Sequence, residues 1–193
     1  MTIMISCRHL ALAFAGAACL ASGPVFAQQK LIAENSEIVF ISKQMGVPVE
    51  GRFKKFDAQV AFDPAKPATS RVAFTVDTGS ATLGVPETDA ELPKAVWFNV
   101  PKFPQATFES GSIKAVGAGR YEVAGKLRIK GVVHDVLVPV SLTQTCASTT
   151  AAGSFVIKRL VFKIGENEWA DTSMVADDVQ VRFKLALSGV PKL

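Results

Sequence analysis

The sequence predicts an all-β domain in which an antiparallel sheet of about eight strands closes into a barrel. Three observations predict this fold. Apolar side chains recur at every second position through most of the chain, helical spacing is rare, and glycine- and proline-rich turns separate the alternating runs. The chain has 193 residues, 49% of them hydrophobic and 20% charged, so it is long enough for one domain with its own core and too apolar to be intrinsically disordered.

The alternation defines the strands in chain order. Phe56, Ala58, Val60 and Phe62 alternate with polar residues, as expected of a strand with one buried face. The same pattern, in places over only a few residues, predicts strands over residues 38–41, 47–53, 56–62, 72–76, 106–113, 121–129, 136–142, 155–164 and 179–187.

Short turns with almost no helix between the strands indicate an antiparallel meander. Residues 143–150 are polar and predict a loop. The long interruption is residues 79–104, where Thr88 and Glu91 have the spacing of a capping box and Pro93 suits the start of another helical turn. We therefore expect a long loop with a short helix, placed as a lid or plug.

Each strand has one apolar face that must be buried, and closing the sheet into a barrel also removes its exposed edges. About eight strands is the size at which a barrel interior is either filled with side chains or holds one small ligand. Alternation alone does not show which face is apolar, so an outer-membrane barrel is an alternative. That class needs aromatic girdles, for which one Tyr and two Trp are few.

Residues 1–27 are predicted to be a secretory signal peptide, which leaves residues 28–193 as the domain. A basic start at Arg8 and His9 precedes an apolar run too short to span a bilayer, and small residues precede a cleavage site after Ala27. We expect a periplasmic protein.

Lipidation at Cys19 is the alternative to cleavage after Ala27, although the preceding residues lack the usual large aliphatic side chain. In either case Cys146 is the one cysteine left in the domain, so the domain forms no internal disulfide and depends on its core.

The titratable residues of the domain do not suggest catalysis, a metal site or a cofactor. The domain has one histidine, His134, and one cysteine, Cys146, whereas zinc sites take three or four protein ligands. His134 and Asp135 are neighbours in the chain and would point to opposite faces of a strand. A formal net charge of +4 spread along the chain is not a nucleic-acid signature. We expect a protein that is not an enzyme and does not bind nucleic acid.

Several segments together resemble the YceI-like family over roughly residues 34–188. They are Gly51-Arg52-Phe53, Phe62-Asp63-Pro64, Trp97-Phe98-Asn99, residues 103–108 (FPQATF), residues 121–131 (YEVAGKLRIKG), Phe162-Lys163-Ile164-Gly165, and Trp169 before the last strand. This resemblance implies a periplasmic, lipocalin-like barrel that binds a long polyisoprenoid in an apolar tunnel. Members that carry a histidine just after the first strand differ from this chain, which has Ser42-Lys43-Gln44 there, and residues 86–92 replace a usual Arg-Asp pair.

The function expected from this resemblance and from the phenylalanine-rich alternation is a periplasmic carrier of an isoprenoid lipid or quinone. Transient contact with a membrane surface is expected too, with Lys43, Arg52, Lys54 and Lys55 available to attract anionic headgroups. The alternative is an accessory of a membrane b-type cytochrome with a filled barrel, and a homodimer is a further option.

Alternate residues of a strand point to the same face, a property that we call strand parity. Strand parity predicts which residues would line the tunnel. They are Phe40, Phe56, Phe62, Phe74, Phe108, Leu127, Ile129 and Phe183. Three large aromatic residues outside the regular alternation are expected to form a plug or lid: Trp97, Phe98 and Trp169.

Overall fold

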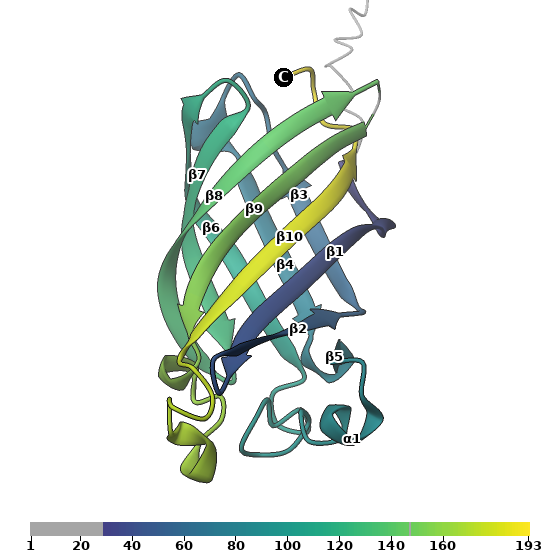
Figure 1. Cartoon of the computed structure of the whole chain (residues 1–193). Coiled ribbons are helices and arrows are strands. Elements are labelled where there is room, and N and C mark those ends of the chain that lie inside the picture. Colours follow the sequence, from purple (N-terminus) through teal and green to yellow (C-terminus); the bar gives the residue numbers. More distant parts are fainter. Residues whose placement is uncertain (1–28, 147) are drawn as a thin grey trace, which may run out of the picture.

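The computed structural model describes residues 29–146 and 148–193, so the predicted signal peptide and Cys19 lie outside the described residues. The described chain is all-β and antiparallel, with very little helix (Figure 1). Its ten strands are β1 (Lys30–Gln44), β2 (Val47–Phe53), β3 (Phe56–Ala61), β4 (Arg71–Asp77), β5 (Ala81–Thr82), β6 (Gln105–Gly117), β7 (Arg120–Ile129), β8 (Val132–Thr145), β9 (Ser148–Lys158) and β10 (Asp178–Ser188).

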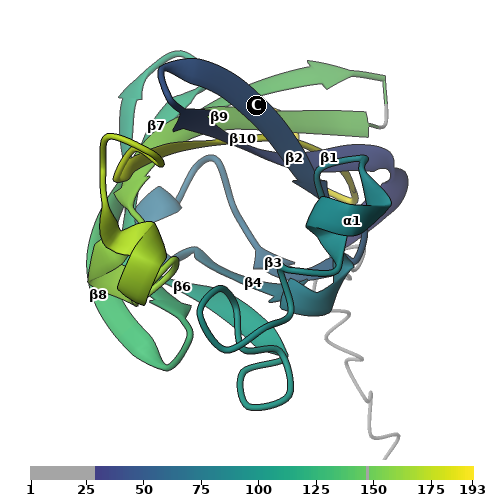
Figure 2. The same ribbon diagram turned by 60° about the horizontal axis from the view of Figure 1, so that its bottom comes forward.

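All ten strands belong to one sheet, in the order β3-β4-β6-β7-β8-β9-β10-β1-β2-β5. Most neighbours in the sheet are also neighbours in the chain, as the meander predicts. The sheet curls until β3, the first strand in this order, lies against β1, and Figure 2 shows the strands arranged around a central axis. The structure has ten strands where about eight were expected: each of the nine alternating runs contributes to a strand, and the two-residue β5 adds a tenth beside β2 at one edge of the sheet.

The curled sheet is closed by side chains instead of a continuous backbone ladder. β1 lies against β3, but no ladder pairs these two strands. At one end of this seam the side-chain amide of Gln29 accepts a hydrogen bond from the N–H of Phe62 at 2.8 Å and donates one to the Phe62 carbonyl at 2.7 Å. One glutamine thus replaces a pair of ladder hydrogen bonds where the two edges meet.

The apolar faces of the strands point inward and the charged faces outward. In β10, Leu185 and Leu187 are buried inside, whereas Arg182 and Lys184 are exposed outside. A barrel in the outer membrane instead presents an apolar band to lipid on its outside. No helix within the described residues is long and apolar enough to cross a membrane.

Several local predictions need correction. β1 starts at Lys30, well before residue 38, because a bulge between Ile32 and Glu37 lets the strand continue. The Ser36 hydroxyl donates to the Ile32 carbonyl and accepts from the N–H of Ala186, which satisfies the backbone at the bulge.

The polar residues 143–150 are not a loop, since β8 and β9 continue as a hairpin up to a tight turn. Cys146 lies in this turn with a positive φ of 54°. In the insertion, α1 (Pro86–Asp89) begins at a proline preceded by Val85, so Thr88 does not cap it.

The two ends of the barrel differ. At one end the rings of Phe62 and Tyr121 meet edge to face, with centroids 5.1 Å apart. The side chain of Gln144 holds the C-terminal tail there through the carbonyls of Val190 and Pro191 and the N–H of Leu193. We call this the plugged end.

The connections at the opposite end include the β1–β2 turn, the insertion from residue 83 to residue 104, and the loop from residue 159 to residue 177 (Figure 2). We call this end the mouth.

Candidate ligand-binding cavity

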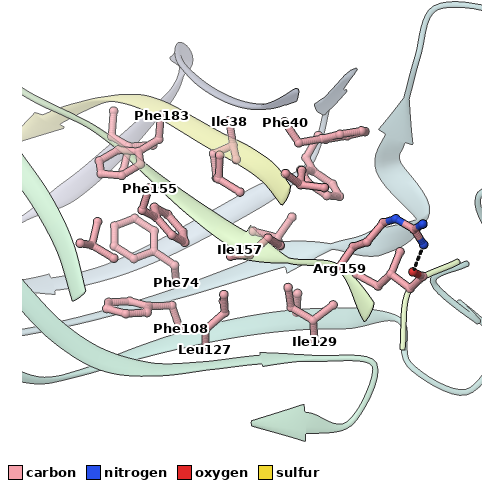
Figure 3. A pocket seen from close by; sticks show the side chains of 18 of the residues that line it. Ile38, Phe40, Phe74, Phe108, Leu127, Ile129, Phe155, Ile157, Arg159 and Phe183 are labelled. Atoms are coloured by element: carbon pink, nitrogen blue, oxygen red, sulfur yellow. Dashed lines mark hydrogen bonds between the residues drawn. The ribbon is translucent and has the colours of Figure 1, made fainter. Parts of the chain in front are cut away.

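The barrel is hollow. A cavity of about 360 Å³ runs along its inside, which is within the usual size range of small-molecule sites. On β10 alone, alternate residues from Val179 to Leu187 line it, and eight residue steps of a strand span about 26 Å. Figure 3 shows side chains from facing walls pointing toward one another across it. The cavity is therefore elongated along the barrel.

Most of the residues nominated by parity meet at this cavity. Those that line it are Phe40, Phe62, Phe74, Phe108, Leu127, Ile129 and Phe183. Phe56 does not. It packs against the apolar cluster of Ile38 and Leu185 instead, at the first residue of β3. Trp97, Phe98 and Trp169 line the cavity at the mouth.

Three phenylalanine rings lie against the inner wall of the barrel, each over a glycine. Each ring occupies the space that a side chain at the glycine would take. A Cβ added to Gly51 would collide with the ring of Phe40, and one added to Gly153 would lie 2.5 Å from Cζ of Phe183. Gly51 and Gly153 are the cross-strand partners of these two phenylalanines. The ring of Phe108 lies in the same way over Gly125. Because these rings rest against the wall, they leave the centre of the barrel open.

The polarity of the lining changes along the cavity. From the plugged end to the middle it is almost entirely apolar, with Phe183, Phe155, Phe74 and Phe108 facing each other (Figure 3). Apart from Tyr121 at the plugged end, the polar lining residues belong to segments at the mouth: Ser42, Gln44, Thr88, Glu91 and Arg159. An amphiphile with one polar end therefore matches this cavity best with that end at the mouth.

Arg159 is the most unusual of these residues, because it is buried, with 2% of its surface exposed. Its guanidinium donates to five backbone carbonyls, those of Ile164, Gly165, Trp169, Val175 and Ala176, at 2.6 to 3.0 Å. Burial lowers the pKa of Arg159, while the nearby Asp177 opposes that shift.

All the donor positions of Arg159 are thus directed at the mouth loop, and none is left for a ligand headgroup. Arg159 holds the loop that borders the cavity, and Figure 3 places it at one end of the lining.

Contacts between two loops close part of the mouth. The rings of Trp97 and Trp169 lie 5.4 Å apart, and the N–H of Gly165 donates to the carbonyl of Val96 at 2.7 Å. Lys130, almost fully buried, supports the same loop by donating to the Lys163 carbonyl at 2.5 Å and to a Glu166 carboxylate oxygen at 2.9 Å.

The insertion is held to the barrel by Asp89. Its carboxylate accepts hydrogen bonds from the Thr82 hydroxyl and from the N–H of Leu83 at 2.6 Å. These two hydrogen bonds, the one from Thr82 first, lower the pKa of Asp89, with a smaller contribution from the charge of Lys54. The carboxylate therefore fixes α1 beside β5 in its ionised form.

Titratable groups do not converge in the cavity. Within the described residues, no group of three or more His, Cys, Asp and Glu side chains is placed to hold a metal ion. His134 lies in β8 with an exposed side chain, and its ring meets that of Phe162 edge to face, with centroids 5.1 Å apart. The chemistry that this cavity supports is apolar binding.

Parity missed several lining residues. Ile38, Phe53, Phe155 and Ile157 line the cavity as well. Ile38 shares the parity of Phe40, so that signal was present in the sequence. Phe155 and Ile157 follow Gly153 in a run whose small residues hide the alternation.

Comparison with known proteins agrees with this architecture. The sequence matches the YceI-like domain over residues 30–187. A "UPF0312 protein" of Azotobacter vinelandii is 32% identical over 135 residues, which cover 68% of this chain and 70% of that protein. The crystal structure of BcnA from Burkholderia cenocepacia has a TM-score of 0.79 and 45% sequence identity, covering 81% of this chain and 98% of that one.

A polyisoprenoid binding domain from Saccharophagus degradans has a TM-score of 0.68 and covers 83% of this chain and 98% of that one. Its sequence identity is 14%, so it shows the fold alone.

Proposed function

The chain belongs to the YceI-like family, and on that premise we propose that it binds a long isoprenoid lipid or quinone in the barrel cavity and carries it in the periplasm. The observation that carries the proposal is the long cavity, apolar over most of its length and polar at the mouth. A solved neighbour of the same fold is described as a polyisoprenoid binding domain, which supports an isoprenoid as the ligand class. The proposed role is binding, not catalysis.

The transfer free energies favour a ligand that exchanges between the barrel and a membrane over one that is taken up from water. Burying a chain of about 40 carbons at ~0.8 kcal/mol per methylene sums to roughly 30 kcal/mol, more than the practical affinity limit of about 18 to 21 kcal/mol. That sum overestimates the affinity because the chain must also be ordered. A free isoprenoid lies in a bilayer, which is itself apolar. Transfer from bilayer to barrel is therefore close to balance, as a carrier requires.

The hollow interior argues against the alternative function, in which the protein is a cytochrome accessory with a filled barrel. The walls carry eight phenylalanines, yet the centre is open because rings such as Phe40 and Phe183 lie on glycines. The interior is not filled, which does not match the filled barrel that this alternative assumes.

The direct test is native mass spectrometry of the protein purified from its own organism, followed by lipid extraction. We expect a bound species of isoprenoid mass. A protein that is isolated empty and also takes up no added isoprenoid quinone from detergent contradicts the proposal.

A matched pair of variants tests the site. Val181 lines the cavity from β10, and Lys184 is exposed on the outer face of the same strand. Val181→Trp should fill the middle of the cavity and lower uptake of an isoprenoid quinone at least tenfold. Lys184→Trp, which adds the same ring outside, should leave uptake unchanged. Equal uptake by both variants would place the ligand elsewhere.

A further inference from the structure

We infer that the mouth of the barrel docks on a lipid bilayer through exposed apolar side chains that surround it. These side chains are Met45, Val47, Val85, Trp169 and Met174, which we call the mouth rim. The inference rests on the proposed function for its purpose, since a bilayer is where an isoprenoid is stored. Docking itself is measurable without any ligand.

The mouth rim comes from the β1–β2 turn, the insertion and the loop from residue 159 to residue 177. Met45 and Val47 lie at the β1–β2 turn and are the most exposed large apolar residues in the described chain, at 71% and 62%. The N–H of Met45 donates to the carbonyl of Met174 at 2.8 Å, and Gln44 pairs with Val175. These contacts place the β1–β2 turn beside the loop that carries Trp169. Val85 precedes α1 in the insertion.

The cavity opens inside this rim. Gln44, Thr88, Glu91 and Trp169 all line the cavity, and each retains exposed surface. At the plugged end the rings of Phe62 and Tyr121 meet edge to face and belong to one apolar cluster. A ligand that leaves through the mouth therefore passes between apolar side chains, and with the rim in a bilayer it does not cross water.

A bilayer fits this rim better than a protein partner does. A stable protein interface buries about 800 Å² on each side with a continuous apolar centre. The rim consists instead of separate side chains on different loops, around an opening that a protein would have to seal. Separate apolar side chains on turns can each enter the headgroup region of a bilayer on their own.

The charges near the rim are of both signs. Lys43 lies beside the β1–β2 turn, while Glu168 and Asp171 lie in the loop that carries Trp169 and Met174. Lys54 is close enough to lower the pKa of Asp89 at the insertion. The basic residues expected to attract anionic headgroups are thus offset by acidic ones, so docking depends on apolar insertion and little on lipid charge.

The test is flotation of the purified protein with phosphatidylcholine vesicles, and with vesicles that also contain phosphatidylglycerol. We expect the protein to float with both kinds of vesicle, with little loss when the salt concentration is raised. Vesicles of brominated phosphatidylcholine should quench tryptophan fluorescence, because Trp169 is in the rim and Trp97 is next to it.

Two valines provide a matched control. Val47 is 62% exposed in the rim, and Val116 is 53% exposed in β6, near the β6–β7 turn at the plugged end. Val47→Ser should lower vesicle partitioning about three- to tenfold, the range expected when one such side chain no longer leaves water. Val116→Ser should leave partitioning unchanged. Met45→Ser combined with Met174→Ser should reduce it further.

The outcomes separate this inference from the proposed function. Uptake of an isoprenoid quinone from detergent without flotation overturns docking and leaves the carrier proposal intact. Flotation without quinone uptake supports docking and overturns the carrier proposal. Equal losses in Val47→Ser and Val116→Ser, or flotation abolished by salt, also overturn docking through the apolar rim.

Discussion

The ring of Phe40 on β1 lies over Gly51, its cross-strand partner on β2, in the place where a side chain would otherwise stand. This pair shows how the barrel keeps a cavity although its inner faces are rich in phenylalanine. A larger residue at position 51 would force the ring off the wall. The ring could then move only toward the centre, where the ligand is proposed to lie.

Gly51→Ala should therefore reduce the cavity with a limited loss of stability. The three atoms nearest to the added methyl all belong to the Phe40 ring, which can turn away, so we expect a free energy of unfolding lower by about 1 to 3 kcal/mol, as in overpacking. Uptake of an isoprenoid quinone should fall several-fold. Denaturant unfolding and a quinone-binding titration measure the two effects.

The control for this variant is Gly111→Ala, where the nearest contact of the new methyl is an ordinary 3.7 Å from the Ala124 carbonyl. Combining Gly51→Ala with Phe40→Leu should restore uptake, because the smaller side chain makes room. If the combined variant binds no better than Gly51→Ala alone, the ring is not what blocks the cavity.

Arg159→Lys should destabilise the mouth loop. A lysine offers three donors without the planar geometry of guanidinium, so at least two of the five carbonyls lose their partner. We expect a loss of about 3 kcal/mol, from unsatisfied buried carbonyls. Hydrogen exchange of residues 160–177 should rise more than that of β7.

Arg182→Lys is the matched control for Arg159→Lys, because the Arg182 guanidinium is exposed and pairs with Glu50 at 2.7 Å. Exposed pairs of this kind contribute at most about 1 kcal/mol. Equal effects of the two substitutions would mean that the carbonyl contacts of Arg159 do not stabilise the loop.

Tryptophan fluorescence should report which end of the cavity holds the headgroup. The sequence has two tryptophans, Trp97 and Trp169, and both lie at the mouth. An isoprenoid quinone bound with its headgroup at the mouth should quench most of their emission, because quinones quench at short range. A polyprenyl alcohol of the same chain length should bind with little quenching. Weak quenching by a bound quinone would place its headgroup at the plugged end, about 26 Å away along β10.

The contribution of Asp89 should depend on pH. Its folded-state pKa is lowered by the hydrogen bonds from Thr82 and Leu83, so the stabilisation is present above the ordinary carboxyl pKa and is lost as pH falls through the folded value. Asp89→Asn should speed hydrogen exchange of the Leu83 amide at pH 7. At a pH below the folded pKa the variant and the original chain should exchange alike. A difference that is the same at both pH values would contradict this account.

Strand parity could predict most of the cavity wall, because a barrel buries one face of each strand and the pattern of that face is local. Phe74, Phe108 and Phe183 are such cases. Phe56 is the one nominated residue outside the cavity lining, since facing inward is not enough to line a cavity. At the start of β3 this side chain packs in the cluster of Ile38, close to where β3 meets β1.

The buried polar residues could not be predicted in the same way. Arg159 and Lys130 are charged residues that a sequence pattern assigns to the surface. Their partners are backbone carbonyls and the Glu166 carboxylate in a loop with no periodicity, and one of the residues that supply a carbonyl, Lys163, has a positive φ of 59°. Only the folded loop brings these acceptors together.

The seam between β1 and β3 also decides how the molecule comes apart. Elsewhere around the barrel, separating two long strands breaks a whole ladder, whereas at this seam the contacts to separate are those of Gln29 with Phe62 and side-chain packing such as that of Phe56 on Ile38. Strands held on a single side are the first to detach when a protein opens locally. The barrel can therefore widen at the seam between β1 and β3 to admit a large ligand, while all the strand ladders stay intact.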